Sequence, residues 1–392
     1  MTNSIQRLDL EQSIKILYLL NNYAFRPTPP LPDFDDFAER IRGRKGVDYY
    51  GAFENGQPQT IAAAIQLNQN IRGRIIPMGG IANVATHPAA RRKGYVRALM
   101  HHIYKEFADM GMGVSCLYPF KEAFYQRLGY VTLPQAKTIQ FDPKVLLPTL
   151  KLNLEGEVEL ISFEEGYEAY RRFLEILQPN THGMAIFTYP QRDKVRESSF
   201  WLAVARKGEE IIGMMRYSLK GQSLDQLLSA PDFLFINNQA KFLFFNWIAR
   251  HIDQATKVEL TLNPKIQGET LYTDIRPKFD GVFVAPMARV IDITALSNMP
   301  CGEGAIDIQL LDPDCDWNNG NWHLGSQDGQ LNISKSPKAD CKLTIQGLTG
   351  LVYGVYKPDE LNLRGWGEIN KKSEQVLESM FPSAIPFIHA MY

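Results

Sequence analysis

A cluster of cations marks the segment of this sequence that is best suited to chemistry. Apolar residues recur at helical spacing from about residue 91 to residue 110, and they predict a helix that buries Val96, Leu99, Met100, Ile103 and Phe107. The first two turns of this helix hold Arg91, Arg92, Lys93 and Arg97. A helix N-terminus carries partial positive charge, so each cation there costs about a few tenths of a kcal/mol unless an anion binds.

Gly94 lies among these cations and lets the backbone approach a ligand closely. The N–H groups in the first turn of a helix have no partner within the helix, so they are free to donate to an anion. The segment therefore predicts a phosphate-binding turn, with a pyrophosphate as its natural occupant. The alternative interpretation is a basic helix start that faces only solvent.

Other chemical signals are weaker. The segment DPDCDWNNGNWH at 312–323 imitates the start of a calcium loop, but Trp317 replaces the required glycine and His323 replaces the terminal glutamate. We therefore expect a polar surface turn there and no metal site.

The histidines are scattered, and His101 and His102 are expected to face solvent. The cysteines show no metal-ligand spacing and are expected to be reduced thiols in a cytosolic protein: Cys116, Cys301, Cys315 and Cys341.

The elements that must position the basic turn form a mixed α/β pattern over the first 145 residues. Two helices come first, and Asn55-Gly56 then predicts the hairpin of an antiparallel meander. Strand, helix, strand, helix and strand follow. The strands are predicted at 47–54, 60–68, 75–86 and 114–119 and from Tyr130 onward, with a brief helix at 121–128.

The rest of the chain divides into two further blocks. The block from about 150 to 290 repeats the same order of elements, but no basic glycine turn precedes its helix at 242–249, whose apolar residues are expected to face a core. Short strands with Gly, Asn and Asp turns follow and predict a small α+β domain. The predicted domains are 1–148, 149–290 and 291–392.

Composition agrees with several globular domains. The chain has 392 residues, of which 45% are hydrophobic and 22% charged, and these values exclude a disordered chain, a fibre and a coiled coil. A net charge of −1 argues against a protein whose whole surface binds nucleic acid. No segment has the ~20 apolar residues that span a bilayer, and no secretion signal is recognisable, so a cytoplasmic protein is expected.

The basic turn and a second segment resemble the Gcn5-related N-acetyltransferases (GNAT). In that family an R/QxxGxG/A turn follows the fourth strand; Arg91 and Gly94 match it, whereas Val96 replaces the usual Gly or Ala. The segment FYQRLGYV at 124–131 is similar to the family's segment of aromatic residue, Tyr, three variable residues, Gly and aromatic residue. The order of the three blocks resembles the enhanced intracellular survival (Eis) type, in which tandem GNAT folds precede a sterol-carrier-like domain.

The resemblance implies acetyl-CoA as the acyl donor. It places the pantetheine arm along the backbone of Val84, Ala85 and Thr86, and the adenosine or pantetheine portion beside Phe120 and Lys121. The implied pyrophosphate site is Arg91, Arg92, Lys93, Gly94, Tyr95, Val96 and Arg97. Tyr125 would be the general acid that protonates the departing thiolate, because a tyrosine with a pKa near 10 keeps its proton at neutral pH.

The general base implied by the resemblance is the terminal carboxylate of Tyr392. The segment FPSAIPFIHAMY at 381–392 is apolar and has two prolines, so it is expected to dock rather than fray. A carboxylate with a pKa near 3.5 is a weak base toward an ammonium, so it would need partial burial or a relayed water. A neutral amine would attack the thioester directly, and a backbone N–H of the splayed fourth strand would polarise the carbonyl.

The acceptor is the least defined part of this hypothesis. Family members acetylate aminoglycosides or protein lysines, and a polycationic amine needs acidic walls. The candidates follow a proline-rich turn and are Asp33, Asp35, Asp36 and Glu39; the alternative is a solvated helix face. An acyl-CoA or lipid sensor and a protein lysine acetyltransferase remain alternative functions. A homo-oligomer, trimer or hexamer, is expected from the resemblance alone, with neither nucleic acid nor a membrane as a partner.

Overall fold

The computed structural model describes residues 3–26, 28–190, 199–222, 225–276, 278 and 284–390. Contacts divide the chain into two compact units. Unit 1 consists of Met1–Pro134, Thr181–Gln191 and Ala285–Tyr392, and unit 2 consists of Gln135–Asn180 and Arg192–Val284. These units differ from the three sequence-based domains because the first and third blocks share one unit. Strand pairing moves 135–148 into unit 2 and the strand at 287–290 into unit 1.

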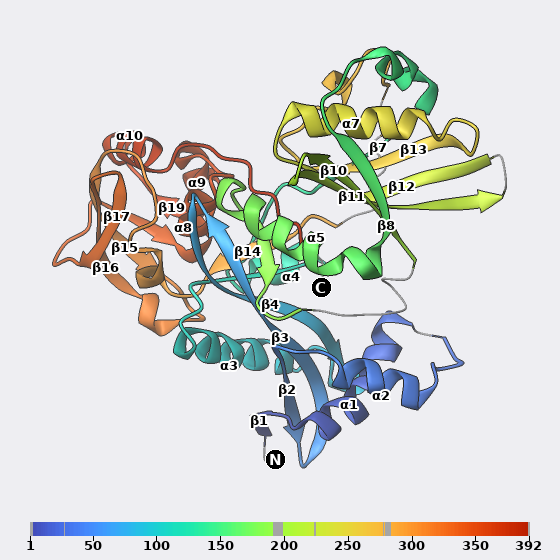
Figure 1. The fold of residues 1–392 in the computed structure, drawn as a ribbon. Helices are drawn as coiled ribbons and strands as arrows, with labels where there is room; N and C mark the ends of the chain where they lie inside the picture. Colours follow the sequence, from blue (N-terminus) through green and yellow to red (C-terminus); the bar gives the residue numbers. More distant parts are fainter. Residues whose placement is uncertain are drawn as a thin grey trace. The chain divides into compact units, whose positions relative to one another are not determined.

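Unit 1 contains a sheet in the order β1-β2-β3-β4-β5-β14-β6, with β9 also paired to β3 (Figure 1). Among the described strands of this sheet, only β4 and β5 pair in parallel. The strands are β1 (Asn3–Arg7), β2 (Val47–Glu54), β3 (Gln57–Ile71), β4 (Arg74–Thr86), β5 (Val114–Leu117), β6 (Val131–Thr132), β9 (Ala185–Phe187) and β14 (Met287–Val290).

Helices cover both faces of this sheet because its buried side chains alternate. Helices α1 (Leu10–Phe25) and α2 (Phe34–Arg42) pack against Ile61 and Ala63 of β3. Helix α3 (Tyr95–Asp109) packs on the other face, against Ala62 and Ala64. Successive side chains of a strand point to opposite faces of the sheet, so neighbouring residues of β3 pack in two separate cores.

The parallel pair opens toward the end of β4. Its pairing with β5 runs only from Met78 to Ile81, whereas β4 continues to Thr86 with β3 as its partner. A register shift and a positive φ of 52° at Asn83 mark a bulge at this point. The far end of β4 therefore leaves the β5-facing edge of its backbone without a paired strand in the part of the chain that the structure describes.

The C-terminal part of unit 1 has a second, five-stranded sheet in the order β17-β16-β15-β18-β19. Its strands are β15 (Ala305–Leu311), β16 (Gly320–Gln327), β17 (Gln330–Lys335), β18 (Cys341–Thr344) and β19 (Gly367–Glu368). Its helices are α8 (Ile345–Tyr353), α9 (Pro358–Leu363) and α10 (Lys371–Met380). Leu348 and Leu351 of α8 join Val114 and Val290 of the first sheet in one continuous apolar core.

The prediction of a polar surface turn at 312–322 is wrong. Asp312, Cys315 and Asn318 are fully buried. Asn318 Nδ2 donates to Asp312 Oδ2 at 2.9 Å, and the guanidinium of the fully buried Arg289 donates to the same oxygen at 2.7 Å. A buried charge must be paired, so this polar segment folds inward to satisfy an arginine whose place in the core the sequence does not reveal.

Unit 2 is a six-stranded sheet in the order β7-β13-β12-β11-β10-β8, with helices on opposite faces (Figure 1). The strands are β7 (Lys137–Phe141), β8 (Glu157–Ser162), β10 (Trp201–Lys207), β11 (Glu210–Gln222), β12 (Asp225–Phe235) and β13 (Ala255–Leu262). Helix α5 (Phe163–Leu177) follows β8, and α7 (Asn238–Ala249) connects the parallel pair β12 and β13. Helix α7 buries Phe245 and Ile248, so the expected core-facing helix is confirmed.

The two units repeat one plan. In unit 1 a helix follows β1, three antiparallel strands come next, and α3 links the last of them to its parallel neighbour β5. In unit 2 the order is β8, α5, β10 to β12, α7 and β13. The second copy of the scaffold predicted from the sequence is therefore present. None of the described helices combines the length and apolar character that a bilayer crossing requires.

Candidate functional site

The turn before α3 has the geometry of an open anion site. Helix α3 begins at Tyr95, four residues later than predicted, so Arg91, Arg92 and Lys93 lie in the turn itself. Arg92 and Gly94 have positive φ values of 65° and 87°, and no side chain caps the helix. Apart from Gly94 and its two chain neighbours, no described residue has an atom within 4 Å of the position that a Cβ on Gly94 would occupy. A ligand can therefore approach the uncapped N–H groups directly.

The cations of this turn are exposed and have few competing acids. The Lys93 Nζ lies 3.7 Å from Glu54 Oε2, and the guanidinium of Arg91 lies 5.8 Å from the ring centre of Tyr23. No ion pair of Arg92 is found among the described residues. The first turn of α3 has no acidic side chain, so the partial positive charge of the helix adds to that of the three side chains.

Arg97 is held away from this turn by the C-terminal part of unit 1. Its Nη2 donates to Asp314 Oδ1 at 3.0 Å, and His101 Nε2 contacts the same oxygen. Burial alone would raise the pKa of Asp314, but hydrogen bonds from His101 and Arg97 outweigh it and lower that pKa. The expectation that His101 faces only solvent is wrong, and the role of Arg97 in cofactor binding stays a prediction.

The corresponding turn in unit 2 is closed. Only residues 236–237 connect β12 to α7, whereas residues 87–94 connect β4 to α3. Asn237 caps α7 by accepting a hydrogen bond from the backbone N–H of Ala240 at 2.9 Å. A side chain of the helix thus occupies the place that an anion would take, so the second copy keeps the scaffold without the site.

The predicted pantetheine strand lies at the opening between β4 and β5. Ala85 is buried, and Val84 and Thr86 are half-buried. Thr60 ties this end of β4 to β3, since its hydroxyl donates to the Ala85 carbonyl at 2.8 Å. The opposite edge of β4 is then the one available to a ligand, and it leads directly into the basic turn.

Tyr125 lies in α4 (Glu122–Gln126), which follows β5. Its ring is buried and packs edge-on against Phe124, Phe120 and Tyr130, with ring centres 5.1, 5.8 and 6.0 Å away. Burial raises the pKa of Tyr125 above its ordinary value. Its hydroxyl has no hydrogen-bond partner among the described residues, so it remains available as a proton donor. Beside it, Phe120 is 72% exposed.

The C-terminal segment docks, as predicted, as far as the structure describes it. Phe387, Ile388 and Ala390 are buried, and the Ala390 carbonyl accepts a hydrogen bond from the Tyr118 hydroxyl at 3.1 Å. Tyr118 follows directly after β5. Met391 and the predicted base, Tyr392, lie outside the described residues. Sequence reasoning missed Tyr118, because nothing in the pattern VSCLYP marks its tyrosine as an anchor.

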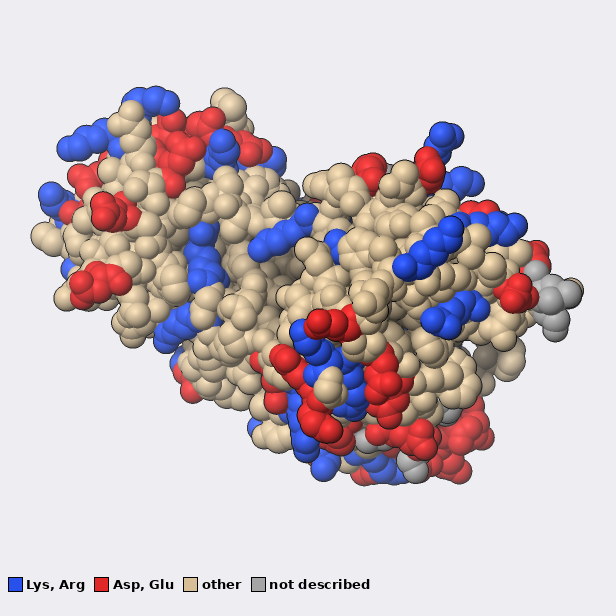
Figure 2. All heavy atoms as spheres, turned by 45° about the horizontal axis from the view of Figure 1, so that its top comes forward, with Lys and Arg blue, Asp and Glu red and all other residues tan. Residues whose placement is uncertain are grey.

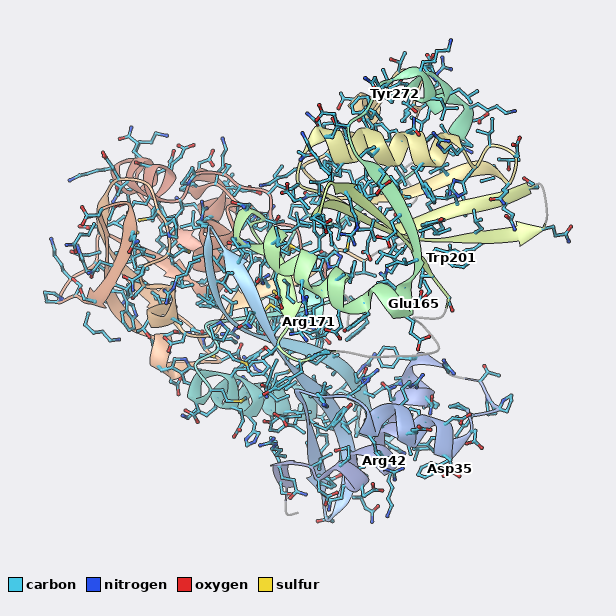
Figure 3. All side chains as sticks on the ribbon, viewed as in Figure 1. Asp35, Arg42, Glu165, Arg171, Trp201 and Tyr272 are labelled. Atoms are coloured by element: carbon cyan, nitrogen blue, oxygen red, sulfur yellow. The ribbon has the colours of Figure 1, made fainter. Side chains whose placement is uncertain are left out.

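The predicted acceptor residues lie on α2. Asp33 caps this helix by accepting hydrogen bonds from the N–H groups of Asp35 and Asp36 at 2.9 and 3.1 Å. Asp35, Asp36 and Glu39 are exposed. Figure 3 shows Asp35 and Arg42 toward opposite ends of this helix, and Figure 2 shows acidic and basic side chains interspersed on the face that it draws. Acids at the start of a helix are favoured by its dipole alone, so the substrate role stays a prediction.

The described residues contain no group of three or more His, Cys, Asp or Glu side chains that could hold a metal ion. The described parts of the candidate site are the open turn, the free edge of β4, the Tyr125 hydroxyl and the docked C-terminal segment. Together they suit an anionic ligand with a long arm that reaches toward a proton donor.

Comparisons with known proteins assign two domains. Residues 5–133 match the acetyltransferase (GNAT) domain, and residues 293–389 match the sterol carrier protein domain. The N-acetyltransferase Eis of Mycobacterium tuberculosis is 30% identical over 81 residues, which are 20% of this chain and 20% of Eis. The match thus spans about a fifth of the length of the curated relatives.

Two solved structures share the fold over the full chain. A probable N-acyltransferase from Enterococcus faecalis has a TM-score of 0.85 at 18% identity, and Eis1 from Mycobacterium abscessus has a TM-score of 0.80 at 17% identity. Each alignment covers 100% of this chain and 100% of the other. The chain therefore contains a GNAT acetyltransferase domain near its N-terminus and a sterol carrier protein domain near its C-terminus, and its fold is similar to that of Eis1.

Proposed function

We propose that this protein is an acetyl-CoA-dependent N-acetyltransferase that transfers acetyl to a primary amine by direct attack. The observation that carries the proposal is the uncapped turn at Gly94, which lies between the free edge of β4 and the start of α3. Exposed cations precede Gly94 in the turn, and beyond its chain neighbours no described residue comes within 4 Å of the position of a Cβ there. This arrangement suits the pyrophosphate of coenzyme A.

In the proposed reaction the pyrophosphate binds at Arg91 to Gly94, and the pantetheine arm lies along Val84 to Thr86. The amine nitrogen attacks the thioester carbon, and a backbone N–H of β4 stabilises the developing charge on the oxygen. The carbon–sulfur bond then breaks, and Tyr125 gives its proton to the leaving thiolate. The proton lost by the amine returns to the tyrosinate through solvent or a base, so the enzyme is restored.

We propose that the base is a carboxylate at Tyr392, the residue that the family resemblance implies. Ala390 is held at the end of β5. Partial burial there would raise the pKa of the carboxylate and make it a better base.

The proposed acceptor is a small polycationic amine, such as an aminoglycoside or a polyamine. The acids of α2 would contribute to its binding. A homo-oligomer in the cytoplasm is the proposed setting. A protein lysine acetyltransferase is the competing function, and it differs in needing a cleft that is not closed by the C-terminal segment.

The first experiment is a calorimetric titration of the full chain with acetyl-CoA at moderate salt. Micromolar binding is expected, and its absence overturns the proposed function. Thiol release is then measured with kanamycin, spermidine and a lysine-containing peptide as acceptors. Deleting Met391 and Tyr392 should abolish most turnover of the small amines, whereas undiminished acetylation of the peptide after deletion would favour the protein lysine acetyltransferase.

A further inference from the structure

Arg72, in the turn between β3 and β4, is a half-buried cation with no ion-pair partner among the described residues. Burial lowers the pKa of its guanidinium to about 10. Its side chain donates three hydrogen bonds to backbone carbonyls, each of 2.8 Å, on Val352, Leu351 and Pro382. A guanidinium with fixed donors is suited to joining several carbonyls in one place.

His182 continues this contact from the segment that leads into β9. Its Nδ1 accepts a hydrogen bond from the backbone N–H of Arg72 at 3.0 Å, and its Nε2 lies 3.0 Å from the Tyr353 carbonyl. A carbonyl only accepts, so the proton must be on Nε2 and the ring must be neutral. The His182 carbonyl in turn accepts from the backbone N–H of Phe387 at 2.8 Å.

These two residues complete the end of α8 and hold the C-terminal segment at the same time. The last carbonyls of a helix have no partner within it, and a cation there is favoured by the helix dipole. Arg72 and His182 donate to three carbonyls at this helix end, those of residues 351–353, of which the Leu351 carbonyl also accepts from the Gly354 N–H at 3.0 Å. They also bind two points of the C-terminal segment, the Pro382 carbonyl and the Phe387 N–H.

Two glycines allow the segment to pass this closely. Gly183 has a φ of 85°, and a Cβ there would lie 2.6 Å from the Cβ of Pro386. Gly354 has a φ of 71°, and a Cβ there would lie 2.6 Å from the backbone nitrogen of Ala384. That nitrogen donates to the Gly354 carbonyl at 2.9 Å. Larger residues at either position would push the segment out of its place.

The path of the segment leads from this anchor to the candidate site. Beyond Phe387, the side chains of Ile388 and Ala390 are buried in the apolar core that the first sheet shares with α8. The Ala390 carbonyl then reaches the Tyr118 hydroxyl just after β5, the strand that precedes α4 and Tyr125. The segment is therefore fixed at both ends of its buried stretch.

We propose that Arg72 and His182 are positioning residues for acetyl transfer, which anchor the C-terminal segment so that Ala390 stays beside Tyr118 at the end of β5. This inference rests on the proposed function and adds the anchor on which the acceptor side of the site depends. Neither residue touches the reacting atoms. Their effect reaches the reaction through residues 382–390.

The test compares Arg72→Ala and His182→Ala with the unchanged full chain. Hydrogen exchange of 381–390, read at the amides of Ala384 and Phe387, should be at least tenfold faster in both variants. The kcat for kanamycin or spermidine should fall at least tenfold, whereas the KM and calorimetric affinity for acetyl-CoA should stay within threefold. His182→Asn, whose side-chain oxygen can accept from the Arg72 N–H, should recover part of the loss.

Arg74→Ala is the matched control, because Arg74 lies two residues further on and donates instead to the Ala295 carbonyl at 3.1 Å. It should leave both the exchange of 381–390 and kcat unchanged. Unchanged exchange or unchanged kcat in Arg72→Ala and His182→Ala overturns the inference. Failure of the unchanged chain to bind acetyl-CoA overturns the proposed function instead, and the exchange measurement still decides whether the anchor exists.

Discussion

Arg289 and Asp312 form an ion pair from which solvent is excluded: their side chains meet at 2.7 Å and both are fully buried. Arg289 also donates to the Leu128 carbonyl at 2.7 Å and lies over the ring of Tyr104, 4.3 Å from its centre. The pair joins β14 to the polar segment that begins at Asp312. It thus connects the first sheet to the C-terminal domain.

Removing one partner of this pair should destabilise the folded protein, because the other charge stays buried without a partner of opposite charge. We expect Asp312→Asn to lower the free energy of unfolding of unit 1 by about 3–5 kcal/mol. Glu11→Gln, which removes the exposed pair with Arg42 at 3.0 Å, should change it by less than about 1 kcal/mol. Urea unfolding, followed by tryptophan fluorescence, measures the free energy of unfolding of both variants. Equal losses in the two variants would contradict the prediction that the buried pair contributes more than the exposed pair.

Tyr125→Phe removes the hydroxyl while keeping the buried ring. We expect kcat to fall by about 100- to 10,000-fold, the usual range for a general acid, with acetyl-CoA affinity nearly unchanged. Because burial raises the pKa of Tyr125, the hydroxyl keeps its proton at every lower pH, and activity should show no loss from its ionisation up to about pH 10. Thiol-release rates across pH test this. Tyr130→Phe, a neighbouring buried tyrosine, is the control.

The basic turn should determine acetyl-CoA affinity. Replacing both Arg92 and Lys93 by alanine should weaken binding by about 100-fold or more, since a hydrogen bond to a charged group contributes about 1.5–3 kcal/mol and two such groups are removed. Binding of the variant should also depend less on salt. Calorimetry at two salt concentrations measures both effects. Lys105→Ala, which removes an exposed cation near the far end of α3, should leave affinity unchanged.

Among the four cysteines, Cys301 should react fastest with a thiol reagent. Burial raises the pKa of Cys116 to about 12 and that of Cys341 to about 11, and it also raises the pKa of Cys315. The thiolate is the reactive form, so these three thiols should react slowly in the folded protein at pH 8. Cys301 is partly exposed. A chromogenic thiol reagent should therefore titrate about one cysteine in the folded chain and four in denaturant, and rapid reaction of Cys301→Ser would contradict this.

Local patterns predicted local structure well. The Asn55-Gly56 hairpin is confirmed: both residues have positive φ, and Glu54 pairs with Gln57. The apolar spacing of α3 is also confirmed, because its side chains face a single core. The start of α3 was predicted four residues too early, since the periodicity alone cannot show that Arg92 adopts a left-handed conformation.

The sequence alone did not predict which distant strands pair with one another. The strand MARV at 287–290 is four residues long, and its place between β5 and β6 is decided by partners that lie far away in the chain. Its Arg289 gives no sign in the sequence of being fully buried, so the inward folding of Asp312 could not be foreseen. Likewise, β1 is a polar edge strand without an apolar alternation to reveal it.

The position of β14 has a consequence for how the chain is made. β5 ends at Leu117, and its neighbour in the sheet begins at Met287, about 170 residues later. At ~5–20 residues per second, a ribosome needs on the order of 10–30 s to supply it. Throughout that interval the nascent chain has β5 with an open edge, and by the end of the interval all residues of unit 2 have been synthesised. Unit 2 can therefore fold before the sheet that carries the candidate site is closed.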